Sequence, residues 1–137
     1  MLELRRSVPT LVAVMDYITQ FKADRLTFID SFRVDAYEDE LKDLDARAKR
    51  IEGSDKAIGW LFDNLGDKSI SDAWNMATKK ASQANRGLTY SNFNRGKNAS
   101  KYEFWKNIEE FMVWLTTKGF NNRRNVTLAQ VHTELTK

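Results

Sequence analysis

The sequence predicts an all-α fold, a compact single-domain bundle of about five or six helices. Three observations support this prediction. The chain has one proline in 137 residues, so almost no position excludes a helix by ring geometry. Apolar residues recur at steps of three and four between glycines and capping residues, which is the spacing of one helix face. No segment alternates clearly between apolar and polar residues, although one short strand pair stays open at residues 10–14 and 87–93, where β-branched and aromatic side chains cluster.

The composition limits the classes of function. The length fits one domain, 1–137, and 42% apolar residues with eight Phe, four Tyr and four Trp supply its core. With no cysteine and one histidine, the chain cannot form a disulfide, a zinc–thiolate cluster or a multi-histidine metal site, so we expect no metal and no cofactor. No apolar run reaches the roughly eighteen residues of a membrane span, and no convincing cleavage site follows the short run after Arg6. We therefore expect a cytoplasmic protein without membrane contact.

The first two helices are expected within residues 7–53. Ser7 can cap a helix that ends near Lys22. Asp24 can cap a second helix, which runs to Gly53 and carries an apolar stripe. The stripe spans about two and a half heptads, so packing within the chain is favoured over an intermolecular coiled coil. Its residues are Val34, Tyr37, Leu41, Leu44, Ala48 and Ile51.

The third and fourth helices are bounded by serines and glycines. The third is expected to begin after Ser54 and to end at Gly66. The fourth is capped by Ser69 or Ser71 and ends at Gly87. Its inner face is mostly alanine, which permits a neighbouring helix to approach closely. The predicted inner faces comprise Ile58, Leu61, Phe62 and Leu65 in the third helix, and Ile70, Ala73, Trp74, Ala77, Ala81 and Ala84 in the fourth.

Capping boxes mark the last two helices. Ser100 and Glu103 predict the start of the fifth helix, which ends before Gly119. Thr127 and Gln130 predict the start of a sixth. The apolar positions are Phe104, Trp105, Ile108, Phe111, Met112 and Leu115 in the fifth helix, and Val131 and Leu135 in the sixth.

Charge divides the chain into an acidic half, residues 1–67, and a basic half, residues 68–137. The first holds ten Lys and Arg against fourteen Asp and Glu, and the second holds twelve against five. No acid occurs between Asp72 and Glu103. Solvated helices usually interleave acids with their cations for i,i+4 pairing, so this tract indicates contact with a polyanion, and a solvated face is the alternative. Its cations are Lys79, Lys80, Arg86, Arg95, Lys97 and Lys101.

Residues 87–100, GLTYSNFNRGKNAS, are expected to form a loop inside this tract. Its glycine–lysine pair invites comparison with a nucleotide-binding P-loop, but Ser91 and Asn98 stand where that motif requires Gly and Ser or Thr. What remains is a tight turn followed by a helix start at Ser100, whose free N–H groups can donate hydrogen bonds to a phosphate. A plain connection between helices is the alternative.

The loop and a second basic cluster complete the predicted nucleic-acid interface. Tyr90 and Phe93 can stack on unpaired bases, although aromatic residues in connections also fold back onto a core. Two loop asparagines can add base selectivity, and two arginines after the fifth helix add charge. The predicted interface comprises Lys79, Lys80, Arg86, Tyr90, Asn92, Phe93, Asn94, Arg95, Lys97, Lys101, Arg123 and Arg124.

Two other candidates have simpler interpretations. Asp35, Asp39 and Asp43 would stack at i, i+4 and i+8 on the second helix, where a cation could bind, but we favour a solvated face. The nearest acid to His132 is Glu134, which points away at i+2. We therefore expect His132 to be a surface residue without a catalytic role.

The favoured hypothesis is a non-enzymatic nucleic-acid-binding domain that neutralises phosphates of DNA or RNA with the 79–101 tract. The alternative is a protein–protein interaction module, a regulator, inhibitor or self-assembling subunit. Its acidic and basic faces would steer it to a partner or to a second copy. An enzyme is the third class, and we expect none because no nucleophile–base pair or metal set can be assembled.

Overall fold

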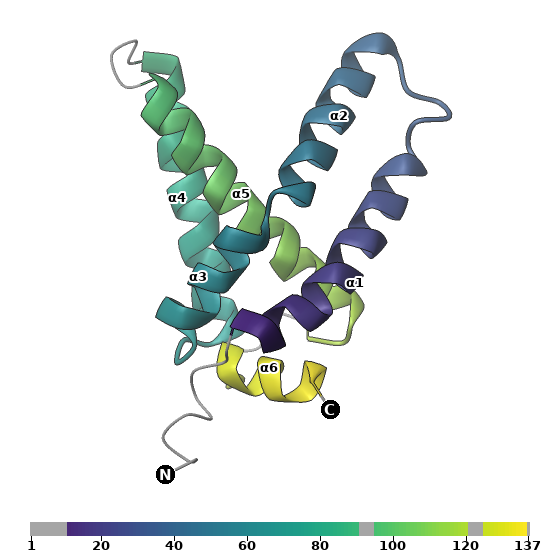
Figure 1. Cartoon of the computed structure of the whole chain (residues 1–137). Coiled ribbons are helices and arrows are strands. Elements are labelled where there is room, and N and C mark those ends of the chain that lie inside the picture. Colours follow the sequence, from purple (N-terminus) through teal and green to yellow (C-terminus); the bar gives the residue numbers. More distant parts are fainter. Residues whose placement is uncertain (1–10, 91–94, 121–124, 137) are drawn as a thin grey trace.

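The structure, a computed structural model, describes residues 11–90, 95–120 and 125–136 and confirms the all-α prediction. Figure 1 shows its helices in chain order. The described residues contain no strand, and only an isolated antiparallel bridge joins Ser69 to Thr127. The strand alternatives are wrong for residues 11–14 and 87–90, which are helical, and the rest of both segments lies outside the described residues. The helices are α1 (Leu11–Asp30), α2 (Glu38–Glu52), α3 (Asp55–Leu65), α4 (Ile70–Tyr90), α5 (Arg95–Thr117) and α6 (Leu128–Leu135).

The helices form two arms that diverge from a common base (Figure 1). One arm is the α1–α2 hairpin and the other is the α4–α5 hairpin. The short helices α3 and α6 lie at the base, beside the N-terminal part of α1 and the C-terminal part of α5. Within the described ranges, no helix combines the length and apolar character needed to cross a membrane.

Aromatic side chains build the core at this base. Phe21 of α1, Phe62 of α3, and Phe111 and Trp114 of α5 are almost completely buried. The Phe21 ring meets the Phe111 and Trp114 rings edge-on, with centroids 5.4 and 5.7 Å apart. Burying a side chain of this size stabilises a fold by about 1.5–3 kcal/mol, so the contacts fix how α1, α3 and α5 meet.

The boundary between the first two helices differs from the prediction. The first helix does not end near Lys22, because α1 continues through Asp24 to Asp30. Asp24 is not a cap: its carboxylate accepts a hydrogen bond of 2.8 Å from Trp114 Nε1. The turn that separates the helices lies instead at residues 31–37, and Arg33 holds it by pairing with Asp30 and with Asp45 of α2.

This shift also corrects the predicted apolar stripe. Val34 and Tyr37 lie in the turn and are 85% and 79% exposed. Only Ile51, at the other end of the stripe, is fully buried. Leu44, in the middle of α2, is partly buried against the core, whereas the N-terminal end of the helix extends along the arm (Figure 1).

The predicted loop at residues 87–100 is largely helical. Gly87 does not end α4, which reaches Tyr90, and Ser100 does not begin α5, which starts at Arg95. The expected capping box is absent, because Glu103 lies inside α5 and pairs with an arginine of α2. Packing of α4 along α5 compensates for the weak helix propensity of glycine.

Other predicted boundaries are confirmed. Ser69 Oγ accepts a hydrogen bond of 3.1 Å from the Asp72 amide at the start of α4. Thr127 and Gln130 form the predicted capping box of α6. Gly119 follows α5 with a φ of +94°, a conformation that favours glycine. These ends depend on local chemistry, which the sequence makes visible.

The predicted alanine face is also confirmed, since Ala73, Ala77, Ala81 and Ala84 are buried.

Candidate nucleic-acid interface

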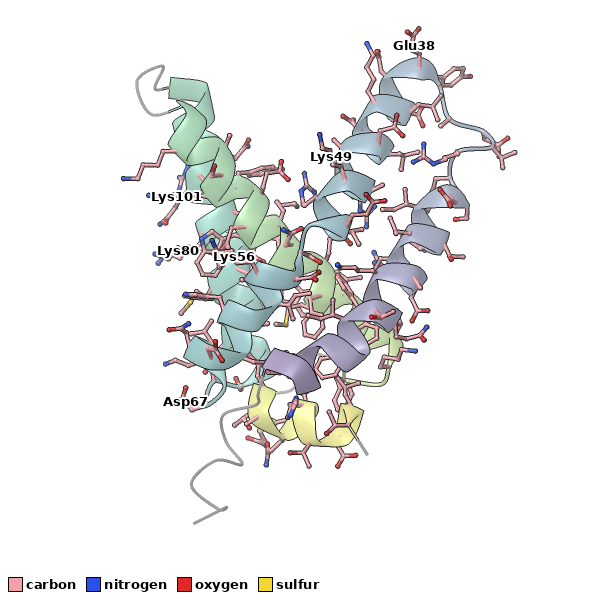
Figure 2. The ribbon with its side chains drawn as sticks, viewed as in Figure 1. Glu38, Lys49, Lys56, Asp67, Lys80 and Lys101 are labelled. Atoms are coloured by element: carbon pink, nitrogen blue, oxygen red, sulfur yellow. The ribbon has the colours of Figure 1, made fainter. Side chains whose placement is uncertain are left out.

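The α4–α5 hairpin carries the predicted basic tract on two helices instead of on a long loop. Both helices continue into the predicted loop, so the described residues of the acid-free tract between Asp72 and Glu103 run along almost all of α4 and the N-terminal part of α5. The buried alanine face of α4 lets α5 approach closely. Lys80 of α4 and Lys101 of α5 thereby lie at the same edge of the hairpin (Figure 2).

Five of the predicted residues are exposed side chains on this hairpin. Lys79, Lys80 and Arg86 project from α4, and Lys97 and Lys101 project from α5. The backbones of two more predicted residues, Tyr90 and Arg95, form the facing ends of the two helices. The remaining predicted residues, Asn92, Phe93, Asn94, Arg123 and Arg124, lie outside the described residues.

Lys80 and Lys101 flank a shallow hollow between the two helices. Figure 2 shows both side chains at the same edge of the α4–α5 hairpin. The hollow has a volume of about 260 Å³, and Gln83, Ala84 and Trp105 complete its lining. It therefore combines two cations, an amide and an aromatic surface. These groups can contact a phosphate and an adjacent base or sugar.

Trp105 packs against the core, as the sequence predicted, and its part in the lining of this hollow was missed. Lys97, Lys101 and Trp105 are spaced i, i+4 and i+8, so they follow one stripe of α5. That signal is readable only if the helix begins before Lys97. Placing the helix start at Ser100 concealed it.

The cations of the acid-free tract, residues 73–102, differ from those elsewhere in the chain in their pairing. None of the five described side chains forms an ion pair with another described residue. Elsewhere in the described ranges, seven of eleven cations pair with acids. Glu103, the acid that closes the tract, is paired with Arg50 of α2. The outer part of this arm therefore carries uncompensated positive charge.

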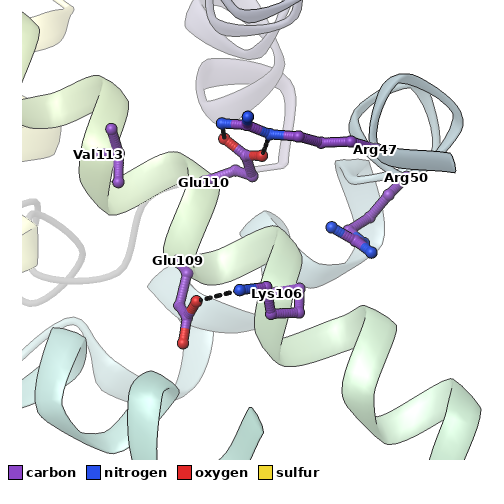
Figure 3. A pocket seen from close by; sticks show the side chains of 6 residues that line it. All are labelled: Arg47, Arg50, Lys106, Glu109, Glu110 and Val113. Carbon is purple, nitrogen blue, oxygen red and sulfur yellow. Dashed lines mark hydrogen bonds and ion pairs between the residues drawn. The ribbon is translucent and has the colours of Figure 1, made fainter. Parts of the chain in front are cut away.

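A second hollow, of about 280 Å³ between α2 and α5, shows the opposite situation (Figure 3). Arg47 pairs with Glu110, and Lys106 donates to Glu109 at 2.9 Å. Burial raises the pKa of Glu110, but hydrogen bonds and charge from Arg47 and Arg25 outweigh burial and hold it below its usual range. Because its charges satisfy one another, this hollow offers little attraction to an external anion.

His132 is more buried than the sequence suggested. It is half-buried at the base, and its Nδ1 lies 3.0 Å from the hydroxyl oxygen of Tyr17. Its ring also packs against Phe62, with centroids 5.9 Å apart. Burial lowers the pKa of His132 and raises that of Tyr17. The prediction of a simple surface residue is wrong, since this histidine links α6 to α1 and α3.

The predicted row of acids is interrupted. Asp35 lies in the turn before α2, so only Asp39 and Asp43 share a helix face, and all three side chains are exposed. The described part of the chain has no group of three or more acidic or histidine side chains placed to hold a metal ion. Comparison of the chain with models of known protein families, with curated proteins and with solved structures gives no match.

Proposed function

We propose that the protein is a non-enzymatic nucleic-acid-binding protein whose α4–α5 hairpin contacts phosphates of DNA or RNA. The observation that carries this proposal is the group of exposed, unpaired cations within residues 73–102, a stretch of the α4–α5 hairpin that contains no acid. A cytoplasmic location belongs to the same proposal. The five described cations of this group are Lys79, Lys80, Arg86, Lys97 and Lys101.

Binding would depend mainly on counterion release. Each ammonium or guanidinium group that meets a phosphate displaces a condensed cation from the nucleic acid, which favours association at low salt. Because the cations lie on two packed helices, little backbone conformational freedom has to be lost on binding. No ion pair with a described residue has to be broken first. The surface is therefore preorganised for a polyanion.

The hollow beside Trp105 would add a contact that is not purely electrostatic. Lys80 and Lys101 would hold a phosphate at its rim, and the indole would pack against the neighbouring base or sugar. The Gln83 amide can donate to a phosphate oxygen or to a base edge. Unpaired bases can reach such a surface more easily than stacked ones. We therefore expect stacking on the indole to increase the affinity for single strands more than that for duplexes.

Salt titration of binding tests the proposal. Fluorescence anisotropy would measure the Kd of the whole chain for a duplex DNA, and for a single-stranded DNA and a single-stranded RNA of equal length. The salt range would be about 50 to about 300 mM KCl. Five phosphate contacts predict a log–log slope of about −4.5 for the duplex. A flat dependence, or no binding at the lowest salt, would refute the proposal.

Matched variants locate the contact. Lys80→Ala/Lys101→Ala removes two contacts and should reduce the duplex slope by about 1.8. Lys49→Ala/Lys68→Ala removes the same charge from exposed positions on α2 and in the turn before α4, and should leave the slope unchanged. Equal weakening by both double variants would show that net charge matters and the hairpin does not. Trp105→Leu should weaken single-strand binding by about 1–3 kcal/mol if bases stack on the indole.

A further inference from the structure

We propose that the tip of the α1–α2 hairpin, residues 28–43, docks on the α4–α5 hairpin of a second copy of this chain. The first observation is an exposed apolar cluster. Phe28, Phe32, Val34 and Tyr37 are the large apolar side chains that the described residues expose most, at 42–85%. The Phe28 and Phe32 rings meet edge-on with centroids 4.9 Å apart. An apolar cluster with a polar rim is typical of a protein interaction surface.

The rim of this tip is acidic. Residues 28–43 contain six acids and two cations. Arg33 is already paired with Asp30, so it does not neutralise the other acids. Those side chains are exposed and form no ion pair with a described residue. The unpaired acids are Asp35, Glu38, Asp39, Glu40 and Asp43.

The complementary surface lies on the other arm of the same chain. Residues 73–102 contain six cations and no acid. Figure 1 shows that the arms diverge, and Figure 2 places Glu38 at one tip and Lys80 and Lys101 on the opposite arm. The tip and the basic hairpin of one chain therefore do not neutralise each other. Two copies can do so, because the tip of one would meet the basic hairpin of the other.

The hollow on the basic hairpin suits the apolar part of the tip. It opens between Lys80 and Lys101 and is lined in part by Ala84 and Trp105. An aromatic side chain of the tip, Phe32 or Tyr37, would cover the indole while the acids of its rim meet the lysines. Docking would occupy the surface that we assign to nucleic acid, so a second copy and a nucleic acid would compete for it.

Charge reversal on either surface tests the docking. The tip variant is Asp35→Lys/Glu40→Lys/Asp43→Lys, and the hairpin variant is Lys80→Glu/Lys97→Glu/Lys101→Glu. All six positions are exposed and unpaired among described residues, so both variants should fold, which circular dichroism would check. Sedimentation velocity at an ionic strength of about 0.05 M should show association of the wild type and its loss at about 1 M. Each variant alone should be monomeric.

Mixing the two variants in equal amounts is the decisive measurement. In the mixture, the native tip of the hairpin variant can meet the native hairpin of the tip variant, and the two reversed surfaces also have opposite charges. Association should therefore return. Lys49→Glu, at an exposed position of α2 outside both surfaces, should associate as the wild type does. A wild type that stays monomeric at low salt overturns the proposal and leaves the tip to a basic protein partner. Variants that still self-associate, or a mixture that does not associate, also overturn it.

The apolar contribution has a separate test. Phe32→Ser/Tyr37→Ser keeps the charges and should weaken association at least tenfold if these rings are buried in the contact. Unchanged association would overturn their role. Self-association and nucleic-acid binding can be tested separately. The tip charge variant keeps the basic hairpin, so it should bind duplex DNA at least as tightly as the wild type even though it no longer self-associates.

Discussion

Arg25 and Glu110 form an ion pair inside the protein, with 3.0 Å between Arg25 Nη2 and Glu110 Oε1 and both side chains more than nine-tenths buried. Arg47 approaches the same carboxylate from α2, and its Nη2 donates to Glu110 Oε1 at 3.0 Å. One carboxylate of α5 therefore pairs with two guanidinium groups, one from each helix of the opposite arm. This cluster joins the two arms near their base.

Glu110→Gln should destabilise the fold by about 3–5 kcal/mol, because it leaves two arginines without their counter-charge. Urea unfolding at neutral pH would measure the loss. The wild type should also lose this stabilisation as the pH falls from the usual Glu value of 4.5 through the lowered pKa of Glu110. Glu110→Gln cannot titrate at this position, so its free energy of unfolding should not show the fall that protonation of Glu110 causes in the wild type.

Glu109→Gln is the matched control for this change. It makes the same substitution at the adjacent position, where the carboxylate pairs with Lys106 at 2.9 Å near the surface. We expect a cost of about 0–1 kcal/mol. Equal costs for the two variants would contradict a special role of the buried cluster.

His132 should make stability depend on pH between about 7.5 and 5.5. Burial lowers its pKa below the usual 6.5, so the unfolded chain binds the proton more readily than the folded chain. Stability should therefore fall as the pH drops through 6.5 toward the lowered value. The chain has one histidine, which makes the assignment direct.

Urea unfolding at about pH 7.5 and at about pH 5.5 would measure the free energy of unfolding of the wild type and of His132→Leu. The leucine keeps an apolar contact with Phe62 but cannot titrate. Its stability should change less between the two pH values than that of the wild type. An equal change in both proteins would assign the pH dependence to another group.

Helix boundaries were predictable where local chemistry decides them. The Ser69 cap and the Thr127 capping box each involve residues three apart, and Gly119 supplies a positive φ at the end of α5. Boundaries that depend on tertiary contacts were not predictable. Asp24 resembles a cap in the sequence, but its carboxylate is bound by Trp114, ninety residues away in the chain. Similarly, packing between α4 and α5 keeps Gly87 inside a helix.

The candidate site was predictable only in those features that do not depend on how the helices pack. The absence of acids between Asp72 and Glu103 is visible in the sequence, and exposed cations follow from it. The hollow beside Trp105 was not visible, because it needs two helices placed side by side. The exposed apolar tip was missed because a regular spacing of three and four assigned Val34 and Tyr37 to a buried stripe. Spacing shows which residues share a helix face only if they share a helix.

Ala77→Leu should destabilise the fold by about 1–3 kcal/mol, because the added side chain forces α4 away from α5. Ala77 is fully buried in the face that permits close approach of the two helices. Thr78→Leu places the same side chain on the exposed neighbouring position and should cost less than about 0.5 kcal/mol. Thermal unfolding of both variants would compare them. Similar losses would contradict tight packing along this face.

Gly119→Ala should destabilise the fold by about 1 kcal/mol through its backbone alone. Gly119 has a φ of +94°, where an L side chain is strained, and an added Cβ would meet no atom within 4 Å.

Gly53→Ala is the matched control. At Gly53 φ is −96°, and a Cβ would lie 3.8 Å from the Lys49 carbonyl oxygen, an ordinary contact. We expect this control to be neutral or slightly stabilising, because alanine restricts the unfolded chain. Chemical denaturation of the two variants would compare them, and a cost at Gly53 equal to that at Gly119 would refute the backbone explanation.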